Sequence, residues 1–299
     1  MWTATEGSRA AEAVLASAAI RLLALLGWPV AHSLSPQLHA AAIADAGLDL
    51  AYLAFGVPPE SLEAAVAGLG ALGAVGANVT VPHKAAVLAL ADEVGSEAAA
   101  VGAANTLTWR DGRLVADNTD LPGLLSVLAG LGIQTGDGVL LCGAGGAARA
   151  AAVALGRAGT RVEVVGRRSE AVADVRQVLV AAGGSAEPVV RPRLLVNATP
   201  LGLHGEDPPA RLLEIGPGQI ALDLVYGREP TPFLRAAAAA GATAADGLGL
   251  LVAQAAFSFA IWTGAAPPHR VMQEAARVST GRTGTWVGSP VARGDATLR

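Results

Sequence analysis

The sequence predicts an α/β protein of two domains, and three observations support this prediction. The chain has 299 residues, of which 52% are hydrophobic, so it is long enough to bury two cores. Short apolar runs alternate with helical patterns along most of the chain, which is typical of parallel sheets with crossover helices. A strand, a glycine-rich turn and a helix follow one another at 138–158, the local order of a dinucleotide-binding site.

The first half of the chain is predicted to form one α/β unit with a mostly parallel sheet. The apolar run 21–26 has the composition of a buried strand. Ser35 is placed to cap a helix over 36–46. Asp111-Gly112 predicts the turn of a hairpin. The other elements predicted in this half are strands at 52–57, 74–79, 106–109 and 114–116, and helices at 61–69 and 85–91.

The second half is predicted to contain a second parallel sheet, in the strand order of a Rossmann domain. The strand at 138–142 leads through the glycine turn into a helix at 147–158. The apolar segment 248–262 predicts a long buried helix with one conspicuous polar residue, Gln254. A poorly ordered tail is predicted from Val278 onward. The remaining elements are helices at 121–131, 169–181 and 233–240, and strands at 161–165, 194–197, 221–225 and 241–245.

Composition excludes several classes of function. A net charge of −4 without blocks of like charge argues against nucleic acid and anionic membranes as partners, and leaves a small molecule. Cys142 is the only cysteine, so the chain forms no internal disulfide and no cysteine metal site, and we expect a reducing cytoplasm. The apolar stretch 14–30 is interrupted by Arg21 and does not resemble an export signal. The histidines lack metal-ligand spacing, so we expect no metal.

A group of polar residues follows the strand predicted at 74–79. Asn78, Thr80 and Lys84 bring a carboxamide, a hydroxyl and an amine together, which suits the binding of a polyol. Upstream, Ser33 and Ser35 have the period-two spacing that directs two hydroxyls to one side of an extended segment, where they suit a carboxylate or a diol. An isolated lysine beside a proline is more often a solvated surface residue.

Asp120 favours a catalytic role for Lys84. A lysine and an aspartate in one pocket form a pair in which the amine exchanges a proton with a substrate oxygen while the carboxylate keeps the amine charged. The alternative for Asp120 is that it caps the helix that starts at Leu121, and capping is compatible with substrate binding.

The glycine-rich turn is the predicted cofactor site. Its small residues let backbone amides approach a pyrophosphate at a helix N-terminus; they are Gly143, Ala144, Gly145, Gly146 and Ala147. The next strand, 161–165, is followed by Arg167 rather than by an acidic residue. An acid there binds the ribose diol of NAD and an arginine pairs with the extra phosphate of NADP, so NADP is favoured. The alternative is that Arg167 is simply solvated.

These segments together resemble the shikimate dehydrogenase family over 23–262. The resemblance is carried, in chain order, by HSLSP, NVTVPHK, GAANT, NTDLPG, GAGGAARA, NATPLG, VYGREPTPFL and DGLGLLVAQAAFSFAIWTG. It implies the NADPH-dependent reduction of 3-dehydroshikimate to shikimate on the route to aromatic amino acids. It also implies Lys84 and Asp120 as the catalytic pair. The implied substrate-binding residues are Ser33, Ser35, Asn78, Thr80, Asn105, Tyr226 and Gln254, and Asn197, Thr199 and Gly247 join the cofactor-binding residues.

The same resemblance implies a discontinuous substrate domain. That domain would comprise 1–119 and 248–299, with the NADP-binding Rossmann domain inserted at 120–247 and the active site between them. Two alternatives stay open. One is a family enzyme for quinate or an amino-substituted shikimate, and the other is a catalytically idle NADP-binding regulator. A homodimer is compatible with the sequence, although no motif specifies the oligomeric state.

Overall fold

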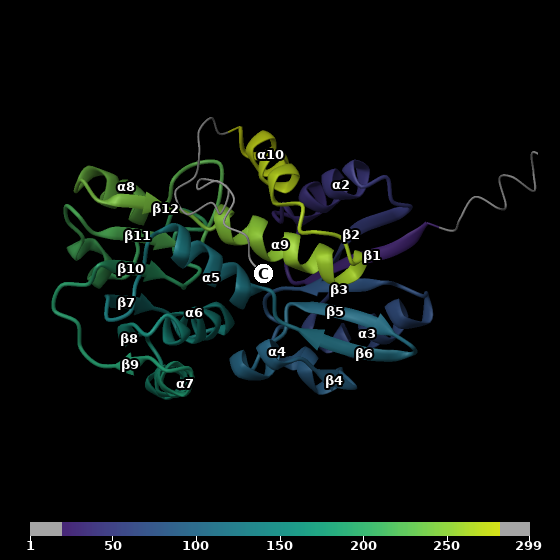
Figure 1. Ribbon diagram of the computed structural model, residues 1–299, viewed down its shortest axis with the longest axis horizontal. Coiled ribbons are helices and arrows are strands. Elements are labelled where there is room, and N and C mark those ends of the chain that lie inside the picture. The colour runs from purple at the N-terminus through teal and green to yellow at the C-terminus, as the bar shows by residue number, and fades with distance from the viewer. Residues whose placement is uncertain (1–19, 282–299) are drawn as a thin grey trace, which may run out of the picture.

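The structure, a computed structural model, describes residues 20–281. Two six-stranded sheets, each covered by helices, lie side by side (Figure 1). The first unit consists of β1 (Arg21–Gly27), α2 (Ser35–Asp45), β2 (Leu50–Gly56), η1 (Pro59–Ser61), α3 (Leu62–Ala71), β3 (Gly76–Val79), η2 (Ala86–Leu90), β4 (Glu93–Val94), α4 (Ser96–Val101), β5 (Thr106–Arg110) and β6 (Arg113–Asp117).

The second unit follows along the chain, and two further helices complete the described residues. Its elements are α5 (Asp120–Gly130), β7 (Gly138–Cys142), α6 (Gly146–Arg157), β8 (Arg161–Val165), α7 (Ser169–Ala181), β9 (Ser185–Ala186), β10 (Leu194–Asn197), η3 (Ala210–Glu214), β11 (Ile220–Asp223), α8 (Pro232–Ala239) and β12 (Thr243–Ala245). The last two helices are α9 (Leu248–Thr263) and α10 (His269–Thr280).

The first sheet is mostly parallel, as predicted. Its strand order is β2-β1-β3-β5-β6-β4, with antiparallel pairing only at β3/β5 and β5/β6. Both faces of β1 are buried: Leu23 and Leu25 belong to the core with α2, α9 and α10, whereas Ala24 and Leu26 face the core with α3. A strand covered on both faces needs a continuous apolar run, which is why 21–26 shows no polar alternation.

The predicted hairpin is confirmed. β5 and β6 pair antiparallel from Thr106 opposite Asp117 to Arg110 opposite Arg113. The two turn residues, Asp111 and Gly112, have φ values of 50° and 76°. Positive φ at both central positions is the type I′ geometry whose twist matches that of paired strands, so Asp-Gly suits this turn.

The second sheet has the order β12-β11-β10-β7-β8-β9 and is parallel throughout. Numbered within this unit, that is the strand order of a Rossmann domain, and it confirms the predicted fold class. In β7, Val139 and Leu141 face the core with α5, α6 and α7, whereas Leu140 and Cys142 face the core with α8. The strand order reverses at β7/β10, where ligands bind in such sheets.

Three sequence predictions were wrong in detail. The helix predicted at 85–91 is the short 3₁₀ helix η2, a form common in segments of a few residues. Ser35 does not cap α2; it is the first residue of that helix, because the backbone carbonyl of Leu34 accepts the first helical hydrogen bonds. Residues 278–280, predicted to belong to a poorly ordered tail, lie in α10, and the rest of that prediction lies outside the described residues.

Helix α9 runs across the middle of the molecule between the two units (Figure 1). It packs against α5, and its buried residues Leu251, Ala255 and Phe259 belong to the core of the first sheet. A helix with apolar residues on nearly all sides is expected to be buried in this way. Four elements, β4, α4, β9 and α10, are present although the sequence did not predict them. Among residues 20–281, no helix combines the length and apolar character needed to cross a membrane.

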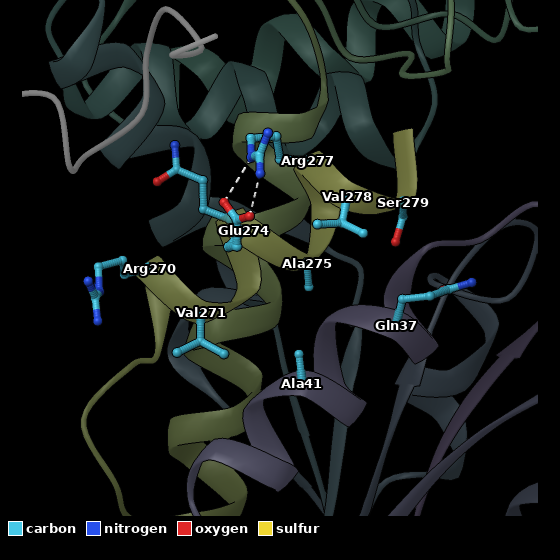
Figure 2. A pocket seen from close by; sticks show the side chains of 10 residues that line it. Gln37, Ala41, Arg270, Val271, Glu274, Ala275, Arg277, Val278 and Ser279 are labelled. Carbon is cyan, nitrogen blue, oxygen red and sulfur yellow. Dashed lines mark hydrogen bonds and ion pairs between the residues drawn. The ribbon is translucent and has the colours of Figure 1, made fainter. Parts of the chain in front are cut away.

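A wide groove runs along the junction of α2 and α10, two helices that pack against each other (Figure 2). It has a volume of about 820 Å³, and Ala41 and Ala275 point toward each other across it. Glu274 and Arg277 form an ion pair at its rim, with 2.6 Å between Oε1 and Nη2. The groove contains none of the predicted site residues. The chemistry of this chain therefore lies elsewhere, in a smaller cavity between the two units.

Candidate active site

A cavity of about 190 Å³ opens between the two units and is lined by every residue that the sequence predicts to be catalytic or substrate-binding. These residues are Ser33, Ser35, Asn78, Thr80, Lys84, Asn105, Asp120, Tyr226 and Gln254. Gly247 and Ala147, two of the predicted cofactor residues, line the same cavity. The chain thus brings together, in one hollow, segments that are more than 200 residues apart in the sequence.

Lys84 and Asp120 form an ion pair in this cavity. Lys84 Nζ donates to Asp120 Oδ2 at 2.6 Å, and the two side chains are only 18% and 10% exposed. Asp120 is the first residue of α5, where the positive end of the helix dipole favours a carboxylate. Asp120 is not the cap of this helix, because Asn118 Oδ1 accepts the hydrogen bond from the Leu121 amide at 3.0 Å. The carboxylate is therefore available to the lysine.

Asn105 holds the other oxygen of Asp120. Its Nδ2 donates to Asp120 Oδ1 at 3.0 Å and to Gln254 Oε1 at 3.3 Å. The backbone amide of Thr119 donates to Asn105 Oδ1 at 2.7 Å, and a backbone amide can only donate, so it determines which end of the carboxamide faces Asp120. Both amide hydrogens of Asn105 have protein partners, and its contact with a substrate stays a prediction.

Asn78, at 4% exposure, is equally well bonded. Its Nδ2 donates to the backbone oxygen of Asn105 at 3.0 Å and to Ser258 Oγ at 2.9 Å. Its Oδ1 accepts from the hydroxyl of Tyr52 at 2.8 Å. The carboxamide is thus oriented by three elements of the fold before any ligand arrives, and only the second lone pair of Oδ1 remains for one.

Ser33 and Ser35 lie next to each other at the start of α2. Ser33 Oγ donates to Ser35 Oγ at 3.2 Å and accepts from the Ser35 backbone amide at 3.2 Å. Ser33, rather than Ser35, therefore organises the backbone at this corner. Tyr226 lies beside them; burial raises the pKa of its hydroxyl, and the Ser33 side chain opposes that effect. The three hydroxyls form one polar wall of the cavity.

The glycine-rich turn has the geometry that a close-approaching anion requires. Gly143 has φ of 134°, and a Cβ atom there would lie 2.6 Å from the backbone oxygen of Ala198. Gly145 precedes α6, and a Cβ atom added to it would meet nothing within 4 Å. The turn is therefore packed against the end of β10 on one side and open on the other, at the N-terminus of a twelve-residue helix. These residues fit a dinucleotide pyrophosphate.

Arg167 is exposed and follows the carboxyl end of β8. The preceding residue, Gly166, lies against the glycine turn, because a Cβ added to it would be 3.5 Å from Ala144 Cβ. An arginine after this strand suits the 2′-phosphate of NADP in folds of this kind, and contact of Arg167 with a cofactor stays a prediction.

The segment after β10 is ordered by its own side chains. Asn197 Nδ2 donates to Leu201 O at 3.0 Å and to Asp223 Oδ1 at 2.9 Å, while Asn197 Oδ1 accepts from the hydroxyl of Thr199 at 2.6 Å. Burial raises the pKa of Asp223 to about 6, even though three hydrogen bonds oppose this change. Asn197 thus shapes the loop, and direct contact of Asn197 or Thr199 with a cofactor stays a prediction. Gly247 allows a close approach, since a Cβ there would lie 2.3 Å from Leu224 O.

Sequence reasoning missed two residues that support the site, Tyr52 and Ser258. The apolar segment 248–262 drew attention to Gln254 alone, although Ser258 stands in the same segment and is 0% exposed. A serine inside a long apolar helix predicts a buried polar contact, because a buried hydroxyl needs a hydrogen-bond partner. Tyr52 gave no such signal, since a tyrosine in a strand is ordinary.

Comparison with known proteins places the chain in a family. Two family models match, the shikimate dehydrogenase substrate binding domain at residues 25–107 and the shikimate 5'-dehydrogenase C-terminal domain at residues 247–277. Shikimate dehydrogenase (NADP(+)) of Anaeromyxobacter sp. is 46% identical over 267 residues, covering 85% of this chain and 95% of that protein. The chain belongs to the shikimate dehydrogenase family.

Two further family members extend this likeness to most of the fold. Shikimate dehydrogenase (NADP(+)) of Citrifermentans bemidjiense is 43% identical over 279 residues, covering 87% of this chain and 96% of that protein. The crystal structure of shikimate 5-dehydrogenase from Thermus thermophilus in complex with NADP(H) and shikimate superposes with a TM-score of 0.77. It is 41% identical and covers 87% of this chain and 99% of that one. The predicted family and fold class are both confirmed.

Proposed function

We propose that this chain catalyses the reversible NADP-dependent reduction of 3-dehydroshikimate to shikimate, on the route to aromatic amino acids. The observation that carries the proposal is the ion pair of Lys84 and Asp120 in the cavity beside the glycine-rich turn. Family membership supports the same reading, because the curated relatives carry the name shikimate dehydrogenase (NADP(+)). A binding module would need neither member of the ion pair.

The chemical step needs a hydride and a proton. NADPH, when bound, would supply the hydride for the ketone carbon. As the carbon–oxygen π pair moves onto the oxygen, Lys84 donates a proton from Nζ to that oxygen, which yields the alcohol. Asp120, bonded to the same amine at 2.6 Å, holds it in the cavity before the step. In the reverse direction the neutral amine accepts the hydroxyl proton.

Substrate binding is assigned to the polar walls of the cavity. Ser33 and Ser35, with Tyr226, would bind the carboxylate, because their hydroxyls converge and no acidic residue stands among them. The ring hydroxyls would meet Thr80 and Gln254. Asn78 would accept with the lone pair that its bond from Tyr52 leaves, whereas Asn105, whose oxygen already has three donors, would meet the substrate through an amide hydrogen it shares with Asp120 or Gln254. Cleft closure would exclude water from this space.

The cofactor would lie along the second unit. The pyrophosphate would sit on the turn formed by Gly143, Ala144, Gly145, Gly146 and Ala147, and Arg167 would pair with the extra phosphate of NADP. Asn197, Thr199 and Gly247 would border the nicotinamide end. With this assignment we propose the domain division 1–119 with 248–299 for the substrate and 120–247 for the cofactor. A homodimer and a cytoplasmic location remain part of the proposal.

Initial rates decide between this function and its rivals. The purified protein is assayed on shikimate and on quinate, each with NADP and with NAD at matched concentrations. We expect the highest kcat/KM for shikimate with NADP. A higher kcat/KM for quinate would reassign the substrate. Tight NADP binding with no turnover of either acid would point to a regulator instead.

A further inference from the structure

Three buried hydroxyl groups lie together beneath the active-site cavity and do not line it. Thr106 Oγ1 lies 3.1 Å from Thr119 Oγ1, and Ser258 Oγ lies 2.9 Å and 3.0 Å from these two atoms. The residues come from β5, from the position before α5 and from α9, and each is at most 1% exposed. We call them the hydroxyl cluster. The hydroxyl cluster connects β5, the start of α5 and α9.

The hydroxyl cluster is bonded to two of the three carboxamides of the cavity wall, those of Asn78 and Asn105. Ser258 Oγ donates to Gln254 O at 3.0 Å, so its oxygen is free to accept from Asn78 Nδ2 at 2.9 Å. Thr106 Oγ1 and Thr119 Oγ1 reach Asn105 Oδ1 at 3.0 Å and 3.1 Å. Each hydroxyl has a single proton, so the three groups donate three hydrogen bonds among six possible contacts, and none of the three oxygens lacks a partner.

Tyr52 orients Asn78 from the opposite side. Its hydroxyl donates to Asn78 Oδ1 at 2.8 Å, and its ring stacks on the ring of His39 with centroids 4.1 Å apart. Burial lowers the pKa of His39 to about 3, so the stacked imidazole is neutral and adds no charge behind the cavity. The stack leaves the phenol little freedom to turn away from Asn78. The backbone oxygen of Asn105, which can only accept, determines which atom of this carboxamide is the nitrogen, and Tyr52 and Ser258 hold its two ends in place.

We propose that Ser258 and Tyr52 are positioning residues of the reaction, which act on the substrate through Asn78 and, by way of the hydroxyl cluster, through Asn105 and Asp120. The proposal rests on the function proposed above, but it concerns residues that touch no ligand. Its physical reason is preorganisation: a carboxamide that loses one of its contacts can tilt or shift, and a small misplacement near the reacting atoms lowers the rate strongly.

Ser258→Ala tests the hydroxyl cluster. We expect kcat to fall roughly tenfold or more, because a misplacement of about 1 Å near the chemistry costs up to about a hundredfold. The KM for NADP should stay within about twofold, since the cluster does not reach the glycine-rich turn. The matched control is Ser126→Ala: Ser126 Oγ also donates to the carbonyl four residues earlier, Pro122 O at 3.0 Å, but on α5 and outside the cluster. Equal kcat in the two variants would overturn the proposal.

Tyr52→Phe tests the second contact and retains the ring stack. We expect the KM for the acid substrate to rise about fivefold, the loss of roughly one hydrogen bond, with an unchanged KM for NADP. An unchanged substrate KM would remove Tyr52 from the proposal. In the double variant with Ser258→Ala, the loss in kcat/KM should be smaller than the product of the single losses, because both act on Asn78. A fully multiplicative loss would contradict this shared route.

The failure of this inference is distinguishable from failure of the proposed function. The parent protein is assayed first, and its rate on shikimate tests the function alone. The variants are then compared with the parent on whichever of shikimate and quinate the parent turns over. Ser258→Thr, which retains the hydroxyl, should recover most of the kcat lost in Ser258→Ala. A folded Ser258→Thr protein as slow as Ser258→Ala would show that packing, rather than the hydroxyl, is what matters.

Discussion

Asn105 donates to Asp120 Oδ1 at 3.0 Å, on the side of the carboxylate opposite the 2.6 Å contact from Lys84. Each oxygen of Asp120 therefore has a donor, and the carboxylate is held between an amide and an amine. A hydrogen bond to a charged group is stronger than one between neutral groups. This arrangement lets Asp120 orient Lys84 without competing for the substrate.

Removal of the lysine amine is expected to abolish most of the chemistry. Lys84→Ala should lower kcat by roughly 10²-fold or more, the usual effect of losing a positioned acid or base, while the KM for shikimate changes much less. Asp120→Asn should lower kcat as well, and the double variant should lose less than the two losses multiplied, since the two groups act as a unit. Steady-state kinetics with shikimate and NADP measures both. A folded Lys84→Ala enzyme with near-parental turnover would rule out the proposed step.

Arg167→Ala is expected to weaken NADP selectively. A charge-assisted contact with the extra phosphate contributes about 1.5–3 kcal/mol, so the KM for NADP should rise about tenfold or more. NAD lacks this phosphate and is the internal control. Titration of the free protein with both cofactors checks the same point without turnover. Equal effects on the KM values for NADP and NAD would show that Arg167 does not bind the extra phosphate of NADP.

Two glycines of the same turn should respond differently to alanine. Gly143→Ala places a side chain at φ of 134° and 2.6 Å from Ala198 O, so we expect a loss of stability of at least about 1–3 kcal/mol. Gly145→Ala meets nothing within 4 Å and should leave the unfolding midpoint unchanged. Its methyl would occupy the space next to a bound pyrophosphate, so NADP affinity should fall roughly tenfold, or about 1.4 kcal/mol. Unaltered NADP binding by Gly145→Ala would place the pyrophosphate elsewhere.

The buried carboxyl of Asp223 should make stability depend on pH. Burial raises its pKa from 3.8 to about 6, so the folded protein favours the protonated form. The corresponding stability is fully present below about pH 4 and is lost as the pH rises through about 6, a change of about 3 kcal/mol at 1.36 kcal/mol per pKa unit. Urea unfolding from pH 4 to pH 7 should show this fall in the parent and a smaller one in Asp223→Asn. The same pH slope in both proteins would assign the effect to other groups.

Much of this protein could be read from its sequence, because the relevant signals are local. The apolar run that became β1 is continuous since both faces of the strand are buried, and Asp111-Gly112 has the residues that a type I′ turn needs. The glycine-rich turn follows its strand directly. Lys84 and Asp120 were found as candidates from residue type and from the family motifs, and the structure places them 2.6 Å apart.

Other features depended on contacts between distant segments. Ser35 looked like a helix cap, but the cap position is Leu34 and Ser33 accepts from the Ser35 amide. The hydrogen bond between Asn78 and Ser258 joins residues 180 positions apart. This hydrogen bond forms because α9 packs between the two sheets. The periodicity of the helix predicts that Ser258 is buried, but it does not identify the partner of the hydroxyl. The sequence by itself therefore determined the two α/β units and the chemical groups, whereas tertiary packing decided which donor meets which acceptor.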